Sequence, residues 1–210
     1  QSLASCSDIV TDDLTALGLE ANQASDFVDK LASTITRSNT NVELYGYALT
    51  QCGAQAGTLG VNVTDLNTAI GLMANAGVKG SKAGMSLKNM LANMAAPTDK
   101  MEAALKKLGM TADETGSYLK TTADGNVDLA ATCKTLMSAM NGMEKSQKVA
   151  LLTAIVGKNA APGILAMLSQ GESAWNELSD SIENSTSTVQ FWNENMSIMG
   201  KKGNEARKII

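Results

Sequence analysis

Apolar side chains recur every three to four residues along most of the chain, which is the spacing of one face of an α-helix. Phe27, Leu31 and Ile35, for example, fall four residues apart. Glycine, proline or short polar runs separate successive stripes. The pattern predicts a mainly α, compact domain of about nine or ten short helices. Their segments are 12–37 with a break near Gly18, 40–57, 63–77, 83–97, 98–109, 129–140, 144–157, 162–171, 172–184 and a last one around 191–199.

Several helix starts carry local signals. Thr40 and Glu43 form a T-x-x-E capping box, which predicts that a helix begins there. Thr64 is predicted to cap the next helix. The adjacent carboxylates Asp12 and Asp13 do not face each other on a helix, so they make no acid–base pair. We expect them to favour a helix N-terminus instead.

One stretch has a strand-like pattern. Residues 117–129 place Asp124 and Gly125, a typical turn pair, between two short runs, so the sequence allows a small β-hairpin there. No linker in the sequence is long enough to require a division into domains.

The polar run at 184–188 is the best candidate for a hinge before the last helix, so we predict a globular module over 1–184. Residues 185–210 would form a polar link and a C-terminal helix that continues into a longer chain.

Composition and charge narrow the function. Aromatic residues make up 3% of the chain, against 12 Met and 18 Gly, so small and flexible side chains must fill the core. The net charge is −4, and acidic and basic residues are interspersed along the chain without a basic stripe. This argues against a general nucleic-acid-binding protein. The chain has no histidine, which excludes the usual metal sites and histidine-based catalysis. We therefore predict no enzyme, no cofactor and no metal.

The segment 75–84, NAGVKGSKAG, stands between two helical patterns and contains three glycines and two lysines. Its G-x-x-G unit is compatible with an anion site at a helix N-terminus, assisted by Lys79 and Lys82. Phosphate loops of the KH and Walker types need strands beside the glycines, and none is evident here. A helix–helix corner is the favoured interpretation.

In that corner, Gly77 ends one helix in the left-handed conformation. Gly80 and Ser81 lead into the next helix, with Ser81 as its cap. Gly84 lets this second helix cross a neighbour closely.

Trp175 and Trp192 are large residues on late helices of an aromatic-poor chain. They are candidate interface anchors, with the core as the safer assignment. The most apolar stretch, 149–169, is interrupted at Lys158 and Pro162, so neither half is long enough to span a bilayer. We predict two packed helices there, with Pro162 in the first turn of the second.

Taken in order, several segments resemble the core region of phage tail tape measure proteins. That family pattern has an SNT-type helix start, an A-(D/N)-AG-x-KGS-x-AG corner, a DGN turn and an LFG-x-x-A segment. The resemblance covers about residues 31–184, nearly three quarters of the chain, and departs from the pattern where IVG replaces LFG. The matching segments are Ser38–Glu43, Leu59–Leu66, Ala74–Gly84, Ala96–Thr98, Leu105–Gly109, Asp124–Asn126 and Ile155–Gly163.

The resemblance implies a structural protein of a phage or prophage tail, assembled in the bacterial host cytoplasm and located in the virion. Family members act as the ruler around which the tail tube forms, and leave the tail before or during DNA ejection. The implied partners are tail tip, hub or baseplate proteins, the tail tube protein and other copies of the chain. No cofactor is implied.

This chain does not look like the ruler itself. As one continuous helix it would span roughly 315 Å at about 1.5 Å per residue, whereas the glycine-punctuated pattern is far more compact. We therefore expect a globular module of a longer tape measure protein, docking at the tail tip. The alternatives are a tape measure of a contractile injection particle, a membrane-active module for genome delivery that uses 149–169, and a cell-wall hydrolase.

Overall fold

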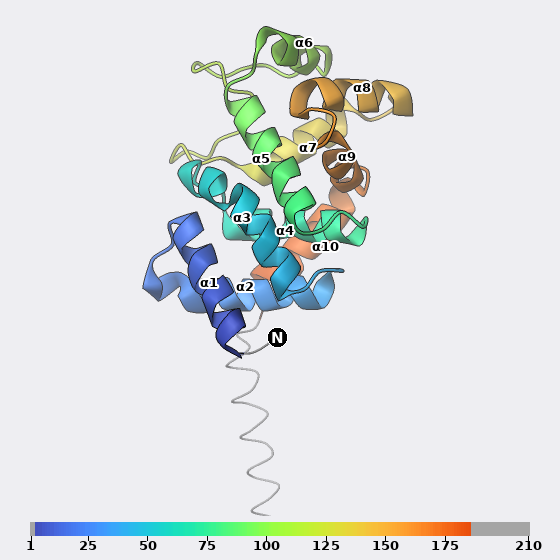
Figure 1. Ribbon diagram of the computed structural model, residues 1–210. Coiled ribbons are helices and arrows are strands. Elements are labelled where there is room, and N and C mark those ends of the chain that lie inside the picture. Colours follow the sequence, from blue (N-terminus) through green and yellow to red (C-terminus); the bar gives the residue numbers. More distant parts are fainter. Residues whose placement is uncertain (1–2, 186–210) are drawn as a thin grey trace, which may run out of the picture.

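Ten α-helices and one short 3-10 helix make up the part of the chain that the computed structural model describes, residues 3–185 (Figure 1). This confirms the mainly α prediction. The predicted C-terminal helix, with Trp192, lies outside the described residues. The helices are α1 (Leu3–Leu17), η1 (Ala21–Gln23), α2 (Ala24–Arg37), α3 (Val42–Thr58), α4 (Val63–Asn75), α5 (Ser81–Ala95), α6 (Asp99–Lys107), α7 (Leu129–Ala139), α8 (Lys145–Val156), α9 (Ala161–Leu168) and α10 (Gly171–Glu183).

Helix α4 is the centre of the fold. Nearly every residue from Thr64 to Ala74 is buried, because α2, α3, α5, α7, α9 and α10 all pack against it. Three of its buried residues, Thr64, Asn67 and Thr68, are polar. The Asn67 side-chain oxygen accepts a hydrogen bond from the Tyr45 hydroxyl of α3, and the Thr68 hydroxyl donates to the Thr64 carbonyl at 2.7 Å. These bonds satisfy the Asn67 oxygen and the Thr68 hydroxyl, whereas the Asn67 side-chain nitrogen has no hydrogen-bond partner among the described residues.

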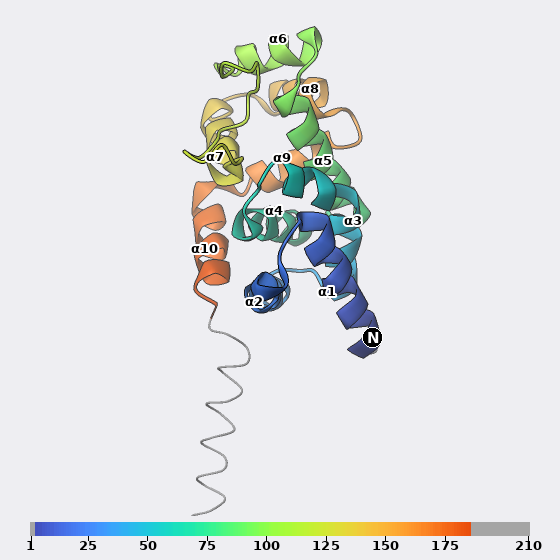
Figure 2. The same ribbon diagram turned by 90° about the vertical axis from the view of Figure 1, so that its left-hand side faces the viewer.

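Helix α5 connects the two ends of the molecule. It packs on α3, α8 and α9. Helices α6 and α8 pair at the far end, while α1 and α2 lie at the opposite end (Figures 1 and 2). A single apolar cluster runs from Leu17 to Ile182, so the described residues share one core.

The predicted hairpin is reduced to a turn with one antiparallel bridge between Thr121 and Val127. The Thr122 N–H donates to the Asn126 carbonyl at 2.8 Å, and the Gly125 N–H donates to the Thr122 carbonyl at 3.0 Å. The Asp128 N–H donates to the Lys120 carbonyl at 2.8 Å on the other side of the bridge. The Val127 N–H points outward and donates to the Leu59 carbonyl at 2.8 Å, which holds the turn against the end of α3.

Residues 149–169 form α8 and α9, which pack against each other as predicted. Pro162 lies in the first turn of α9, where its missing N–H costs no helical hydrogen bond. Over residues 3–185, no helix is long and apolar enough to cross a membrane.

The starts of three helices differ from the predictions. Asn41 caps α3 in place of Thr40, and its side-chain oxygen accepts from the Leu44 N–H at 2.8 Å. Asn62 caps α4 in place of Thr64, whose own N–H donates to the Asn62 side chain at 2.7 Å. Asparagine caps at least as well as threonine, so it takes the position where both are available. Helix α1 begins at Leu3, so Asp12 and Asp13 lie near its end and not at an N-terminus.

Candidate functional site

The corner between α4 and α5 has the predicted backbone shape. Gly77 has a φ of 85°, in the left-handed region, and its N–H donates to the Ala74 carbonyl at 3.0 Å. The next N–H, of Val78, returns to the Met73 carbonyl at 2.8 Å. Glycine suits this position because a side chain there would be strained.

The prediction that Ser81 caps α5 is wrong. Gly80 is its N-cap, with no side-chain hydrogen bond, and Ser81 is already the first helical residue. The φ of 59° at Gly80 sets the direction in which the helix begins. Ser81 therefore lies one residue too far along for its hydroxyl to act as the N-cap acceptor.

Gly84 allows the close helix crossing that the sequence predicts. A methyl group built there would lie 2.8 Å from the Ala48 carbonyl carbon and 2.9 Å from the Ala48 Cα, and nearer still to its oxygen. These are backbone atoms of α3, which no side-chain rotation can move. The crossing of α3 and α5 therefore requires glycine at this position.

Lys79 and Lys82 flank the start of α5; Lys79 is half-buried and Lys82 is exposed. No ion pair between described residues involves either lysine. An anion site at this helix start stays a prediction. The backbone geometry of the corner is enough to explain why glycines occur here.

The segments that carry the family resemblance meet one another in space. The Asn39 N–H, in the SNT segment, donates to the Asn75 side-chain oxygen of the corner at 2.8 Å. At Gly163, in the IVGKNAAPG segment, a methyl would lie 2.9 Å from Ser86 Cβ and 3.4 Å from Val78 Cγ1. At Gly60, a methyl would lie 2.6 Å from Asn126 Cγ of the DGN turn. At Gly60 and Gly163 the glycine therefore leaves room for a side chain from another part of the chain to lie against the backbone.

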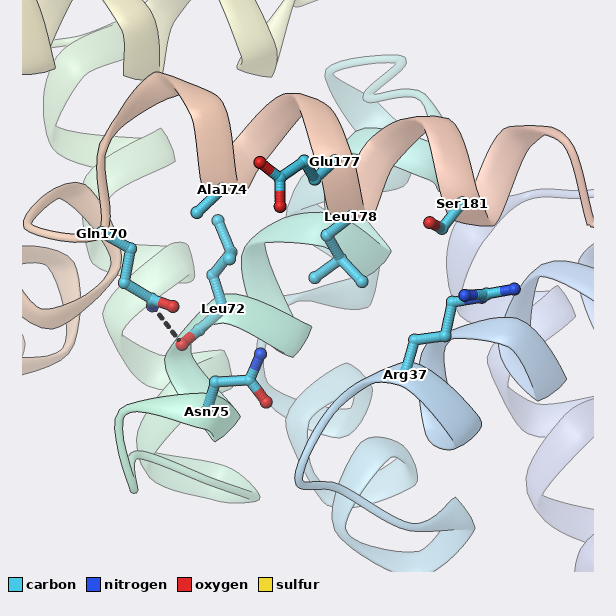
Figure 3. A pocket seen from close by; sticks show the side chains of 8 residues that line it. All are labelled: Arg37, Leu72, Asn75, Gln170, Ala174, Glu177, Leu178 and Ser181. Carbon is cyan, nitrogen blue, oxygen red and sulfur yellow. Dashed lines mark hydrogen bonds between the residues drawn. The ribbon is translucent and has the colours of Figure 1, made fainter.

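A groove lies beside the corner (Figure 3). Helix α10 forms one wall, with α4 and α2 opposite, and the groove has a volume of about 280 Å³. The Gln170 amide donates to the Leu72 carbonyl at 2.6 Å, which closes one end. Eight residues line it: Arg37, Leu72, Asn75, Gln170, Ala174, Glu177, Leu178 and Ser181.

The chemistry of this groove suits contact better than catalysis. Figure 3 shows Glu177 and Arg37 on different walls, with the apolar Leu178 side chain projecting from α10 toward the interior. The carboxylate of Glu177 accepts from the Ser173 hydroxyl at 2.9 Å. The groove offers donors and acceptors around an apolar patch, without a nucleophile next to a base.

An ion pair at the edge of the groove fastens α10. The Lys30 ammonium lies 3.2 Å from Glu183 and 3.2 Å from Asp26, and the Thr64 hydroxyl donates to the Glu183 carboxylate. The bond from Thr64 and the charge of Lys30 lower the pKa of Glu183. Nearby, the Ser33 hydroxyl donates to the Ser181 carbonyl at 2.9 Å. Together these contacts join α10 to α2 and α4.

Trp175 is 1% exposed and lies in the core, the assignment that the sequence favoured. Its ring therefore does not contribute to the described surface, and its indole N–H has no acceptor among the described residues. Trp192, the other candidate anchor, lies outside these residues. Between residues 3 and 185, no group of three or more metal-ligating side chains comes together.

Asp13 is a feature that sequence reasoning missed. It is 3% exposed, and burial, followed by the nearby Asp12 charge, raises its pKa to about 7. Its sequence signal is the spacing of four residues to Ile9 and to Leu17, which places a carboxylate on the apolar stripe of α1.

Comparison with known proteins gives two matches. The model of a family described as phage-related minor tail protein matches residues 1–157. A tape measure protein of Pneumococcus phage Dp-1 is 28% identical over 195 residues, which is 92% of this chain and 16% of that protein. The chain thus spans only a small part of the length of this relative. No solved structure gives a significant match.

Proposed function

Because the chain belongs to the phage-related minor tail protein family, whose model matches residues 1–157, we propose that it is a non-catalytic module of a tail tape measure protein. The module folds as a separate globular unit and contributes to tail assembly by docking on another tail component, at the tail tip. It works in the phage tail, through contacts with tip or tube proteins or with other copies of itself.

The observation that carries this proposal is the compact core of the described residues. A ruler works by its extended length, whereas here the last helices return to cover the earlier ones. Thr64 and Glu183 are bonded across 119 positions of sequence. The match to a small share of a tape measure protein supports the same view, since it leaves most of that protein to do the measuring.

Removal of the module from the full-length gene tests the proposal. In the phage or prophage that encodes the chain, residues 1–210 are deleted in frame and tails are examined by electron microscopy. If the segment were part of an extended helical ruler, the tails would shorten by roughly 315 Å. A docking module instead predicts that tails fail to form or lose their tip, with no population shortened by that length.

A matched control separates docking from general damage. A deletion of equal length from a predicted long helix elsewhere in the same protein should give viable, shorter tails. Normal tails without residues 1–210, or tails shortened in proportion to the deletion, would contradict the docking role. Purified 210-residue chain should also retain isolated tail tips on a column, and the same chain unfolded by heat before coupling should not.

A further inference from the structure

A second pocket, here named the Asp13 pocket, opens between α1 and α3 on the side of the molecule away from the groove. It has a volume of about 210 Å³. Its walls combine carboxylates with apolar and aromatic surface. The lining residues are Ile9, Asp12, Asp13, Glu43, Gly46, Tyr47 and Thr50.

Asp13 is the unusual member of this pocket. One of its carboxylate oxygens, Oδ2, is buried and has no hydrogen-bond partner among the described residues. A buried carboxylate without a partner is costly when ionised, which agrees with the raised pKa of about 7. Native structures keep few such groups, so this one calls for a partner outside the described residues.

The rim of the pocket is suited to a cation with an apolar stem. Asp12 is exposed, and the Glu43 carboxylate accepts from the Tyr47 hydroxyl at 2.9 Å. The Tyr47 side chain is 48% exposed, although it is a large apolar ring. Ile9 and Gly46 form an apolar wall, where a methyl on Gly46 would lie only 2.8 Å from Ile9 Cγ2.

We propose that the Asp13 pocket receives the side chain of a lysine or arginine presented by a second protein. The aliphatic stem of that residue packs against Ile9 and Tyr47, and its charged end meets Asp13. Asp12 and the rim carboxylate of Glu43 add charge complementarity, which guides the approach of a basic surface.

A basic side chain fits the pocket better than a metal ion. The described residues contain no group of three or more side chains placed to hold a metal, and the pocket wall is partly apolar. None of the ion pairs between described residues reaches Asp12 or Asp13, so no lysine or arginine among those residues neutralises the charge there. This inference concerns one pocket and does not depend on the tail role.

Three short peptides test the proposal on the intact 210-residue chain. They are acetyl-Gly-Lys-Gly-amide, its arginine counterpart, and an uncharged control in which norleucine replaces lysine. We expect the two basic peptides to cause saturable chemical-shift changes at the Ile9 methyl groups and the Gly46 amide. The Asp13 carboxyl pKa should fall in the same titration, since a bound cation favours the ionised form. The norleucine peptide should cause neither effect.

Two variants of α1 locate the binding. Asp13→Asn should lower the affinity for the basic peptides by at least about tenfold. Asp8→Asn, which removes a carboxylate from α1 outside the pocket, should change that affinity by less than about twofold. Equal binding of norleucine, absence of saturation, or an equal loss in both variants would overturn the proposal. If Asp13→Asn fails to fold, the comparison of lysine with norleucine still decides it. Tail assembly is not involved, so a negative result leaves the proposed function untouched.

Discussion

Gly84→Ala is the change that tests the packing of the fold most directly. The substitution adds one methyl group at the crossing of α3 and α5. In an open helix it would stabilise by about 0.5–1 kcal/mol, because alanine loses less backbone entropy than glycine. Here the methyl would come within 2.8 Å of the Ala48 carbonyl carbon.

The expected loss of stability follows from the backbone atoms of Ala48 that the added methyl group would contact. Overpacking typically costs about 1–3 kcal/mol, and contact with backbone belongs at the upper end because the two helices must separate. After the gain in propensity, we expect a net loss of about 2 kcal/mol. For a domain of this size that corresponds to a melting temperature lower by about 4–8 °C.

Thermal and urea unfolding followed by far-ultraviolet circular dichroism measures this loss. Met85→Ala, at an exposed neighbouring position of α5, is the matched control and should change stability little. The double variant Gly84→Ala with Ala48→Gly should not recover stability, because the contact is with the Ala48 backbone and not with its side chain. A Gly84→Ala protein as stable as the parent, or one rescued by Ala48→Gly, would refute the crossing.

Three further predictions concern the corner, a cap and a buried charge. Gly77→Val should lower the free energy of unfolding by about 1–2 kcal/mol in urea titrations, because valine is strained at a φ of 85°; unchanged stability would contradict this. Asn41→Ala should cost about 1 kcal/mol, while Thr40→Ala should cost much less, and equal losses would return the cap to Thr40. Asp13 binds its proton more tightly in the folded state, with a pKa of about 7 against 3.8, so its contribution to stability falls as pH rises from about 4 to about 7. Between these pH values the free energy of unfolding of the parent should fall by up to about 1.4 kcal/mol per pH unit because of Asp13, and this fall should be absent in Asp13→Asn. Identical slopes in parent and variant would contradict the prediction.

The sequence was informative where one strong local signal decides the outcome. The four-residue spacing of Phe27, Leu31 and Ile35 predicts α2, and the glycines at 77 and 84 predict a corner and a crossing. These features depend on backbone geometry that few other residues allow. The Pro162 helix start was predictable for the same reason.

Features that depend on distant partners were not predictable. Asn41 and Thr40 are both good caps, and a difference of one residue at a helix start is finer than the sequence pattern resolves. The turn near Asp124 had a sequence signal, but the bond from the Val127 N–H to the Leu59 carbonyl, which fixes the turn against α3, had none. Asp13 lies on an apolar stripe, and only the packing of α1 on α3 shows that this carboxylate is buried.

The candidate groove was also invisible in the sequence. Its walls come from α2, α4 and α10, which are far apart along the chain, and no motif links Arg37 with Ser181. The corner residue Asn75 was part of a recognisable segment, but its bond to Asn39 becomes apparent only in three dimensions.

The central place of α4 has a consequence for how the protein is made. Its final cover, α10, leaves the ribosome only after on the order of 100 further residues, which at bacterial rates of about 5–20 residues per second takes roughly 5–20 s. During that time the side of α4 that α10 later covers is exposed to solvent. The core around α4 is therefore complete only after α10 has been synthesised. A ribosome that stalls before Glu183 leaves exposed apolar surface, which favours aggregation or binding by a chaperone.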